Sequence, residues 1–373
     1  MRKRSIIIVL ALVLAVGLVG VLTAGCGGTT TTTQAPATTT TAGGETTTTE
    51  TKPELNASLN GAGATFPAPL YLEWIGEFTQ KVEPGVRMNY QGIGSGGGIQ
   101  QFMQMTVDFG GTDAPMKDEE IAEAEAEAGA KVMHIPTVFG AVTVAFNLQG
   151  VDELKLDQDT SVDIFLGEIT KWNDPRLVAL NEGVDLPDQG IQICHRSDSS
   201  GTTDIFTNYL TAISDKWADK VGKGKEVQWP VGLGGQGNDG VTALILQSPG
   251  SIGYVELSYA LESNLPTATL KNKSGNFIKP SLESTSAAAV GITYPDDLRF
   301  SLVDGEGPEA YPIVGATWVL VYDKMSDPAK AAALQAFLVW ALTEGDALAK
   351  ELNYAPLPDE LEAVVLDKLS TMQ

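Results

Sequence analysis

The 373-residue sequence has few of the side chains that bind soft metals and few positive charges. It holds two histidines and two cysteines, which are too few to build a zinc or iron–sulfur site. Lys and Arg total 24 against 47 Asp and Glu, so the formal net charge is −23. Because proteins bind nucleic-acid backbones through clustered Lys and Arg, this balance excludes a broad nucleic-acid-binding face. We expect neither a metal site nor a nucleic-acid partner.

Apolar residues and glycine, in contrast, are abundant. Hydrophobic residues make up 43% of the chain, which is enough for a sizeable core and, at this length, is typical of two domains. The 40 glycines lack the strict period of three that collagen requires. The composition therefore indicates a globular protein with many special turns.

The N-terminus has the three parts of a secretory signal peptide. Basic residues 2–4 precede an apolar run over residues 6–22, and small residues follow it. The run nearly reaches the length that spans a bilayer, so an uncleaved membrane anchor is the alternative. The segment that ends in Cys26 resembles a bacterial lipobox, with Thr23 where leucine is usual. We interpret residues 1–25 as a signal peptide and Cys26 as a lipidated N-terminus.

Residues 26–54 are predicted to be an unstructured tether. Threonine dominates residues 29–51, and such a composition cannot form a core. The protein is then exported and held at the outer face of the cytoplasmic membrane, at the cell surface or in the periplasm, by its lipid alone. With Cys26 lipidated, Cys194 has no intrachain partner. Its apolar surroundings indicate a buried core residue, and a reactive thiol is the alternative.

From about Leu55 onward, short β-rich runs alternate with segments of helical periodicity. The β-rich runs cover residues 86–90, 137–146, 191–194, 251–255 and 317–321. Apolar residues recur with a period of 3.6 in segments that start at Pro67, near Gly97, after Gly201 and after Gly240, and over residues 329–352. This alternation predicts an α/β fold.

Four loops place Gly, Ser or Thr immediately before an expected helix. They cover residues 61–67, 92–98, 198–203 and 234–240. Glycine lets the backbone approach a ligand, hydroxyl groups add donors, and the first N–H groups of a helix lack internal partners. Taken singly, each loop is explained by a capped helix start. Together, the four predict an anion site that needs little full positive charge.

One of these loops also satisfies the dinucleotide-binding pattern G-x-G-x-x-G. Residues 92–97 follow an expected strand, and Asp113 stands roughly where a ribose-binding acid would fall. The match is weak, because glycine is so dense in this loop that the pattern is nearly automatic. We therefore expect no cofactor.

The loops resemble those of a known family, the phosphate-binding proteins of the bacterial high-affinity phosphate ABC transporter. The resemblance runs from about Leu59 to Pro358. It is most specific in Leu59–Pro69, Asn89–Ser95, Val107–Pro115, Arg196–Thr202, Gly232–Gly240 and Gly250–Glu256. The sequence departs from the family pattern at His195, where Arg often stands, and at Ser199, where Gly is usual.

The resemblance implies a ligand shell for inorganic phosphate in two halves. One half comprises Thr65, Phe66, Ser95 and Asp113, and the other comprises Arg196, Ser200, Gly201 and Thr202. Asp198 would hold Arg196 in place without touching the ligand. No residue is assigned a catalytic role.

A carboxylate beside an anion is chemically reasonable only when the ligand still carries a proton. At neutral pH phosphate has one to donate and sulfate has none, so Asp113 would accept from phosphate and repel sulfate. An unpaired buried acceptor costs roughly 1–3 kcal/mol, and more when it is charged, so we expect phosphate to be favoured 100-fold or more (about 2.7 kcal/mol). The alternative is that Asp113 only caps a turn before Pro115.

The resemblance also implies the type II periplasmic-binding-protein fold, with two α/β domains joined by crossing strands. Domain I would hold residues 55–146 and 319–373, and domain II residues 147–318. We expect a monomer that passes phosphate to ABC transporter permease subunits and is not an enzyme. A binding protein for another oxyanion, an exported phosphatase and a surface adhesin are the alternatives.

Overall fold

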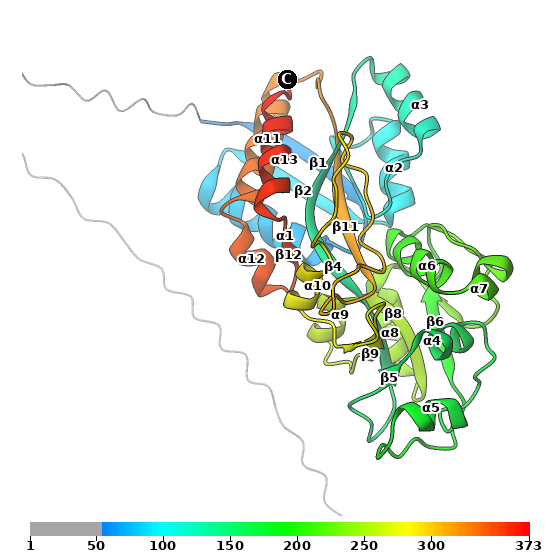
Figure 1. Cartoon of the computed structure of the whole chain (residues 1–373). Helices are drawn as coiled ribbons and strands as arrows, with labels where there is room; N and C mark the ends of the chain where they lie inside the picture. Colours follow the sequence, from blue (N-terminus) through cyan, green and yellow to red (C-terminus); the bar gives the residue numbers. More distant parts are fainter. Residues whose placement is uncertain (1–53) are drawn as a thin grey trace, which may run out of the picture. The chain divides into compact units, whose positions relative to one another are not determined.

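The structure, a computed structural model, describes residues 54–373, and a long mixed β-sheet is its central feature (Figure 1). The strands are β1 (Ala57–Gly63), β2 (Val86–Gly92), β3 (Phe109–Thr112), β4 (Val132–Asn147), β5 (Lys155–Leu156), β6 (Gln192–Arg196), β7 (Leu233–Gly235), β8 (Ser251–Glu256), β9 (Thr269–Lys271), β10 (Phe277–Ile278), β11 (Val314–Tyr322) and β12 (Ala355–Pro356). The large sheet has the order β2-β1-β3-β11-β4-β8-β6-β7, and β12 pairs with β4. A small second sheet has the order β10-β9-β5.

Helices separate most of these strands along the chain. They are α1 (Ala68–Glu77), the π-helix η1 (Phe78–Val82), α2 (Ser95–Met103), α3 (Asp118–Ala128), α4 (Gln158–Phe165), α5 (Pro175–Leu180), α6 (Gly201–Ile213), α7 (Asp215–Lys220), α8 (Gly237–Gln247), α9 (Leu257–Glu262), α10 (Leu282–Ala287), α11 (Pro328–Leu342), α12 (Asp346–Glu351) and α13 (Asp359–Ser370). The α/β class predicted from the sequence is confirmed.

The large sheet has two halves that share strand β4. Val132–Ala141 of β4 pair antiparallel with β11, and Val142–Asn147 pair antiparallel with β8. We call β1–β3 with α1–α3 and α11–α13 the first lobe, and β6–β8 with α4–α8 the second lobe. The domain boundaries drawn from the sequence stay a prediction, because the described residues form one compact unit.

Helices cover both faces of the first lobe (Figure 1). The apolar residues of α1, α11 and α13 belong to the main core, whereas Ile99 and Phe102 of α2 pack with Ala124 of α3 in a separate cluster. The sheet is therefore enclosed on both sides, as a parallel sheet requires.

Two strands of the first lobe were not predicted from the sequence. Strand β1 (ASLNGAG) and strand β3 (FGGT) contain few β-branched and aromatic residues, so their intrinsic β-propensity is weak. Both extend because β1 pairs in parallel with β2 on one side and with β3 on the other. Tertiary pairing overrides local preference here.

The long helix predicted over residues 329–352 is divided into α11 and α12. The chain leaves the helix at Thr343, and the Gly345 carbonyl accepts a hydrogen bond from Trp74 Nε1 at 2.9 Å. A Cβ at Gly345 would lie 2.5 Å from the Ala341 carbonyl oxygen, so the break also requires glycine. The prediction of one continuous helix was wrong for this reason.

Cys194, interpreted from the sequence as a core residue, is buried, and so are Trp172 and His134. Cys194, Trp172 and His134 are at most 3% exposed. Trp172 Nε1 donates to the Gly250 carbonyl at 3.0 Å, and His134 Nε2 accepts from the Met116 N–H at 3.1 Å. Burial raises the pKa of the Cys194 thiol to about 11 and lowers that of His134 to about 4.

The predicted signal peptide, the lipidated Cys26 and the tether up to residue 53 lie outside the described residues. Over residues 54–373, none of the helices combines the length and the apolar character needed to cross a bilayer.

Candidate anion-binding site

The site in the first lobe follows from the parallel pairing of its three strands. Gly63 of β1 pairs with Gly92 of β2 and with Gly111 of β3, so all three strands end at the same edge of the sheet. In parallel sheets the loops beyond the carboxyl ends form the usual ligand-binding crevice. The loop after β1 carries Thr65 and Phe66, Ser95 begins the helix that follows β2, and Asp113 directly follows β3.

The second lobe repeats this arrangement. Strand β6 pairs in parallel with β7, with Arg196 opposite Gly235, and in parallel with β8. The loop after β6 carries Asp198 and Ser200 and leads into α6, and the turn after β7 leads into α8 at Gly237. Each lobe therefore presents strand ends and helix N-termini to one region.

The two lobes meet directly through their loops. The Gly201 N–H donates to Ser95 Oγ at 3.1 Å, and the Gly96 N–H donates to the Ser199 carbonyl oxygen at 2.9 Å. A Cβ at Gly201 would lie 2.5 Å from Ser95 Oγ and 2.6 Å from Asp113 Cβ. Only glycine at position 201 permits this approach.

Asp113 is buried at this junction and makes hydrogen bonds through both carboxylate oxygens. Ser95 Oγ lies 3.3 Å from Asp113 Oδ2 and accepts from the Asp113 N–H at 3.1 Å. Thr317 of β11 donates to Asp113 Oδ1 at 2.8 Å. Burial raises the pKa of Asp113 to about 7, although the Thr317 hydroxyl and the Arg196 charge oppose the shift. The carboxyl group is therefore close to its titration midpoint at neutral pH.

A cavity of about 160 Å³ reaches Asp113 from the side of α6. Asp204 of α6 and Trp318 of β11 are among the residues that line it. Burial raises the pKa of Asp204, and its charge in turn contributes to the raised pKa of Asp113. The Asp113 carboxyl group thus has one acidic neighbour in addition to its hydroxyl partners.

Arg196 is only 3% exposed and is held by two hydrogen bonds to Asp198. Arg196 Nε donates to Asp198 Oδ1 at 2.7 Å, and Nη2 donates to Oδ2 at 2.5 Å. Burial would raise the pKa of Asp198, but the hydrogen bonds and charge of Arg196 outweigh it, so the pKa lies below its usual value. The remaining terminal nitrogen, Nη1, donates to Thr202 Oγ1 at 3.2 Å.

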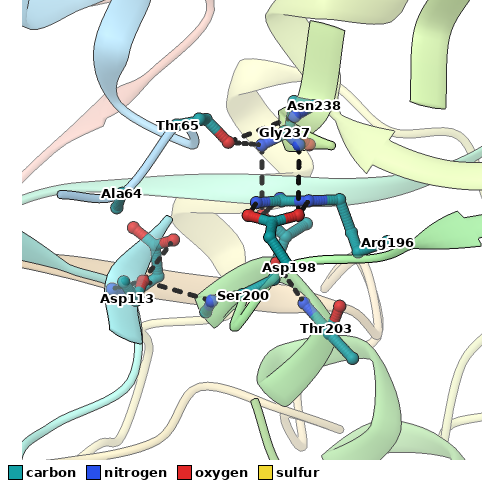
Figure 2. A network of polar contacts seen from close by, with 12 residues as sticks. Ala64, Thr65, Asp113, Arg196, Asp198, Ser200, Thr203, Gly237 and Asn238 are labelled. Carbon is teal, nitrogen blue, oxygen red and sulfur yellow. Dashed lines mark hydrogen bonds and ion pairs between the residues drawn. The ribbon is translucent and has the colours of Figure 1, made fainter. Parts of the chain in front are cut away.

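Asn238, which was not predicted to be a site residue, connects the two lobes. Its side-chain nitrogen donates to Thr65 Oγ1 at 3.0 Å and to Thr202 Oγ1 at 3.1 Å, and its backbone N–H donates to Thr65 Oγ1 at 3.1 Å. Figure 2 shows Thr65, Asn238 and Arg196 within this network. The sequence singles out the segment Gly232–Gly240, but it does not assign Asn238 to the ligand shell, since nothing local marks this side chain as crossing the junction.

The loop of Thr65 and Phe66 is held from behind by two phenols. Tyr259 OH donates to the Thr65 carbonyl oxygen at 2.5 Å, and Tyr354 OH donates to the Phe66 carbonyl oxygen at 2.7 Å. The backbone–backbone hydrogen bonds of the described residues use neither the Thr65 nor the Phe66 N–H group. Because C=O and N–H point in opposite directions across a trans peptide, this arrangement aims the Phe66 N–H away from Tyr259.

Ser200 is the N-cap of α6, and its hydroxyl oxygen accepts from the Thr203 N–H at 3.1 Å. The hydroxyl hydrogen of Ser200 stays available to a second acceptor.

At the two positions that depart from the family pattern, Ser199 contributes its carbonyl to the lobe junction, and His195 stacks on Trp229 with ring centroids 4.9 Å apart. Neither departure displaces a predicted ligand residue.

The chemistry of the assembled groups suits an oxyanion. Within residues 54–373, no group of three or more His, Cys, Asp or Glu side chains has an arrangement that could hold a metal ion. The junction instead combines helix N-termini and hydroxyl groups with the Arg196 guanidinium, which is paired with Asp198, and with the Asp113 carboxyl group. Such a set can surround an anion and accept one hydrogen from it.

This fold and site are those of the periplasmic-binding-protein class. Residues 30–344 match the PBP superfamily domain. The chain belongs to the PstS family of phosphate-binding proteins. It is 41% identical over 308 residues to the phosphate-binding protein PstS of Pasteurella multocida, covering 82% of this chain and 87% of that protein. It is 40% identical over 337 residues to the phosphate-binding protein PstS of Methanocaldococcus jannaschii, covering 83% and 85%.

Solved structures show the same fold. A high-affinity periplasmic phosphate-binding protein, PfluDING, solved with bound phosphate, superposes with a TM-score of 0.69 at 22% identity, covering 83% of this chain and 93% of that one. A phosphate-binding protein from Stenotrophomonas maltophilia gives a TM-score of 0.64 at 19% identity, covering 83% and 93%. The family and the type II fold predicted from the sequence are confirmed.

Proposed function

We propose that this protein captures inorganic phosphate between its two lobes and delivers it to the permease subunits of an ABC transporter. The observation that carries the proposal is the meeting of Asp113 and Arg196, both buried, with two sets of helix N-termini at one junction. Membership of the PstS family supports the choice of ligand.

In the first lobe, we assign the ligand donors to Thr65, Phe66 and Ser95, and the acceptor to Asp113. The Phe66 N–H faces away from Tyr259, which holds the Thr65 carbonyl. The Thr65 N–H likewise faces away from Tyr90, whose hydroxyl donates to the Ala64 carbonyl at 2.8 Å. The Ser95 hydroxyl now joins Asp113 and Gly201, so a ligand at the junction would take over these polar contacts. The exchange replaces protein–protein hydrogen bonds by protein–ligand ones.

In the second lobe, Arg196 would donate to phosphate, together with Ser200, Gly201 and Thr202. Asp198 would keep the Arg196 guanidinium in place, because it already accepts hydrogen bonds from Arg196 Nε and Nη2. Hydrogen bonds between an ionised donor and an anion are about twice as strong as neutral ones. A buried, pre-positioned Arg196 would therefore contribute more than a surface arginine.

The two halves of the shell lie on different lobes, which couples binding to closure. A ligand shifts a conformational equilibrium only by its differential affinity for the two states. Phosphate would contact both lobes only when they are together, so it would stabilise the closed form. Hinged closure of this kind is known for the periplasmic-binding-protein class.

The proposal includes binding without turnover by a monomer outside the cytoplasm. The signal peptide, lipidated Cys26 and attachment by lipid alone to the outer face of the cytoplasmic membrane are part of it, and they rest on the sequence of residues 1–26. Relatives over most of the chain are phosphate-binding proteins, which supports a transport role over a phosphatase or an adhesin.

The test is calorimetric titration of phosphate and sulfate into the protein at pH 8, where Asp113 is mostly ionised and phosphate still carries a proton, with Asp113→Asn as the matched variant. We expect sub-micromolar phosphate binding and no sulfate heat for the wild type. Asp113→Asn should lose selectivity by 100-fold or more (about 2.7 kcal/mol), since its amide neither repels sulfate nor requires a ligand proton. If the wild type binds neither anion, the transport proposal fails. If it binds sulfate as tightly as phosphate, the role assigned to Asp113 fails.

A further inference from the structure

Glu256 is a fully buried carboxyl group at the end of β8 that has no place in the proposed ligand shell. Its Oε2 atom accepts from the Ser258 N–H at 2.8 Å and also contacts the Ser258 hydroxyl. Tyr354 OH lies 2.9 Å from the same oxygen. Oε1 is buried and has no hydrogen-bond partner. An ionised carboxylate with one bare oxygen is costly in such a place.

The position of Glu256 links it to the loop of Thr65 and Phe66. Its backbone N–H donates to Asn238 Oδ1 at 3.0 Å, and Asn238 in turn holds Thr65. Its carboxyl group contacts Tyr354, which lies between α12 and β12 and donates to the Phe66 carbonyl. Glu256 therefore stands two hydrogen bonds away from the backbone that faces the ligand.

Counting hydrogens shows which protonation state this cluster favours. The Tyr354 hydroxyl has one hydrogen, and the Phe66 carbonyl oxygen at 2.7 Å can only accept it. The contact of 2.9 Å between Tyr354 OH and Glu256 Oε2 then lacks a hydrogen, unless the carboxyl group supplies one. A neutral Glu256 donates to Tyr354, Tyr354 donates to Phe66, and the Ser258 hydroxyl donates to Glu256. Ser258 Oγ also lies 2.9 Å from Tyr354 OH, so the cluster has four oxygen–oxygen contacts. A neutral Glu256 leaves one of them without a hydrogen, and an ionised Glu256 leaves two.

We propose that Glu256 is a neutral carboxylic acid when the lobes are in contact, and that it is a positioning residue which, through Tyr354, holds the Thr65–Phe66 backbone ready for the anion. The inference rests on the proposed function, because it assumes that the site binds phosphate. It adds that binding requires a proton on Glu256, a residue outside the ligand shell. Ionisation of Glu256 would draw the Tyr354 hydrogen toward the carboxylate and away from the Phe66 carbonyl.

The titratable groups that face Glu256 do not ionise in the same pH range. Burial raises the pKa of Tyr354, and burial together with the Glu256 charge raises that of Tyr259 on α9. Burial also raises the pKa of Glu256 to about 8, although the contacts with Ser258 and Tyr354, which stabilise an ionised carboxylate, oppose the shift. If phosphate binds only when Glu256 is neutral, its affinity declines as the pH rises above the pKa that Glu256 has in the ligand-free protein.

The experiment measures the phosphate dissociation constant from pH 6.5 to pH 9.5 for the wild type and for Glu256→Gln, whose amide keeps a neutral donor toward Tyr354. We expect the two to agree within about twofold at pH 7. Above pH 8, the wild type should weaken by up to about tenfold per pH unit relative to the variant. The ratio of the two constants cancels the ionisation of phosphate itself. Glu119→Gln, at an exposed position of α3, is the control for loss of one charge and should keep the wild-type profile.

Two outcomes would overturn the inference: an alkaline decline of equal size in Glu256→Gln, or a loss of affinity in Glu256→Gln at pH 7 as large as in Glu256→Ala. An infrared difference spectrum between the wild type and Glu256→Gln at pH 7, without phosphate, gives an independent readout. We expect the carbonyl band of one protonated carboxylic acid to be missing in the variant. An unchanged band in the wild type and the variant would also contradict the inference. If phosphate fails to bind while this band is found, the proposed function fails and the protonation of Glu256 stands.

Discussion

The Asn238 side-chain nitrogen lies 3.0 Å from Thr65 Oγ1 and 3.1 Å from Thr202 Oγ1, and so joins the start of α1 in the first lobe to the start of α6 in the second. Asn238 is fully buried, and its carbonyl oxygen accepts from the Glu256 N–H. One amide thereby spans the lobe junction and is satisfied at both its nitrogen and its oxygen.

Replacing Asn238 by alanine should weaken phosphate binding about 10- to 100-fold. Of the contacts that the change removes, only the one with Thr65 crosses the junction, and its loss costs roughly 1–3 kcal/mol of binding. The contacts with Thr202 and the Glu256 N–H lie within the second lobe, so their loss lowers stability instead. Because the bridge forms only when the lobes meet, we expect most of the loss in the dissociation rate, measured by stopped-flow release into a phosphate trap. Asn276→Ala, which removes one exposed hydrogen bond to Pro308, is the matched control. Equal affinities of Asn238→Ala and the wild type would contradict the assignment.

A methyl group at Gly201 should prevent the lobes from meeting. The added carbon would lie within 2.7 Å of atoms of Ser95 and Asp113, and both of these residues belong to the opposite lobe. We expect Gly201→Ala to bind phosphate at least about 100-fold more weakly (about 2.7 kcal/mol) and to show a larger radius of gyration in X-ray scattering with phosphate present. Gly76→Ala is the control, because its nearest neighbour is a flexible Gln80 side-chain atom at 3.9 Å. A compact Gly201→Ala protein with normal affinity would show that the junction can relax.

The raised pKa of Asp113 should be visible in the stability of the protein without ligand. Burial raises this pKa from 3.8 to about 7, so the folded state binds the proton more tightly than the unfolded state does. The contribution of Asp113 to stability is therefore complete below about pH 4 and declines as the pH rises to about 7, by roughly 1.4 kcal/mol per pH unit at most. Urea unfolding of Asp113→Asn should show a shallower decline over this range. Parallel pH profiles for the two proteins would mean that Asp113 is not perturbed in this way.

Local sequence patterns predicted much of the fold and the residue types of the anion site. Helical periodicity located α1, α2, α6 and α8, and the β-rich runs located five of the strands around the junction. Strands β1 and β3 and the break after α11 escaped, because each depends on partners far away in the sequence. The break at Gly345, for instance, is stabilised by a hydrogen bond from Trp74, 271 residues away.

The sequence by itself determined the family, the α/β class and the residue types of the anion site, since glycine-rich helix starts, Asp113 and Arg196 are local features of ordered motifs. Only the tertiary structure showed that Asn238 reaches Thr65 over 173 residues, that Thr317 holds Asp113 over 204, and that Tyr354 joins Glu256 to Phe66. The physical reason is that a hydrogen bond needs its two atoms within about 3 Å. For residues so far apart along the chain, that distance is set by strand register and by the meeting of the lobes, which no local pattern encodes.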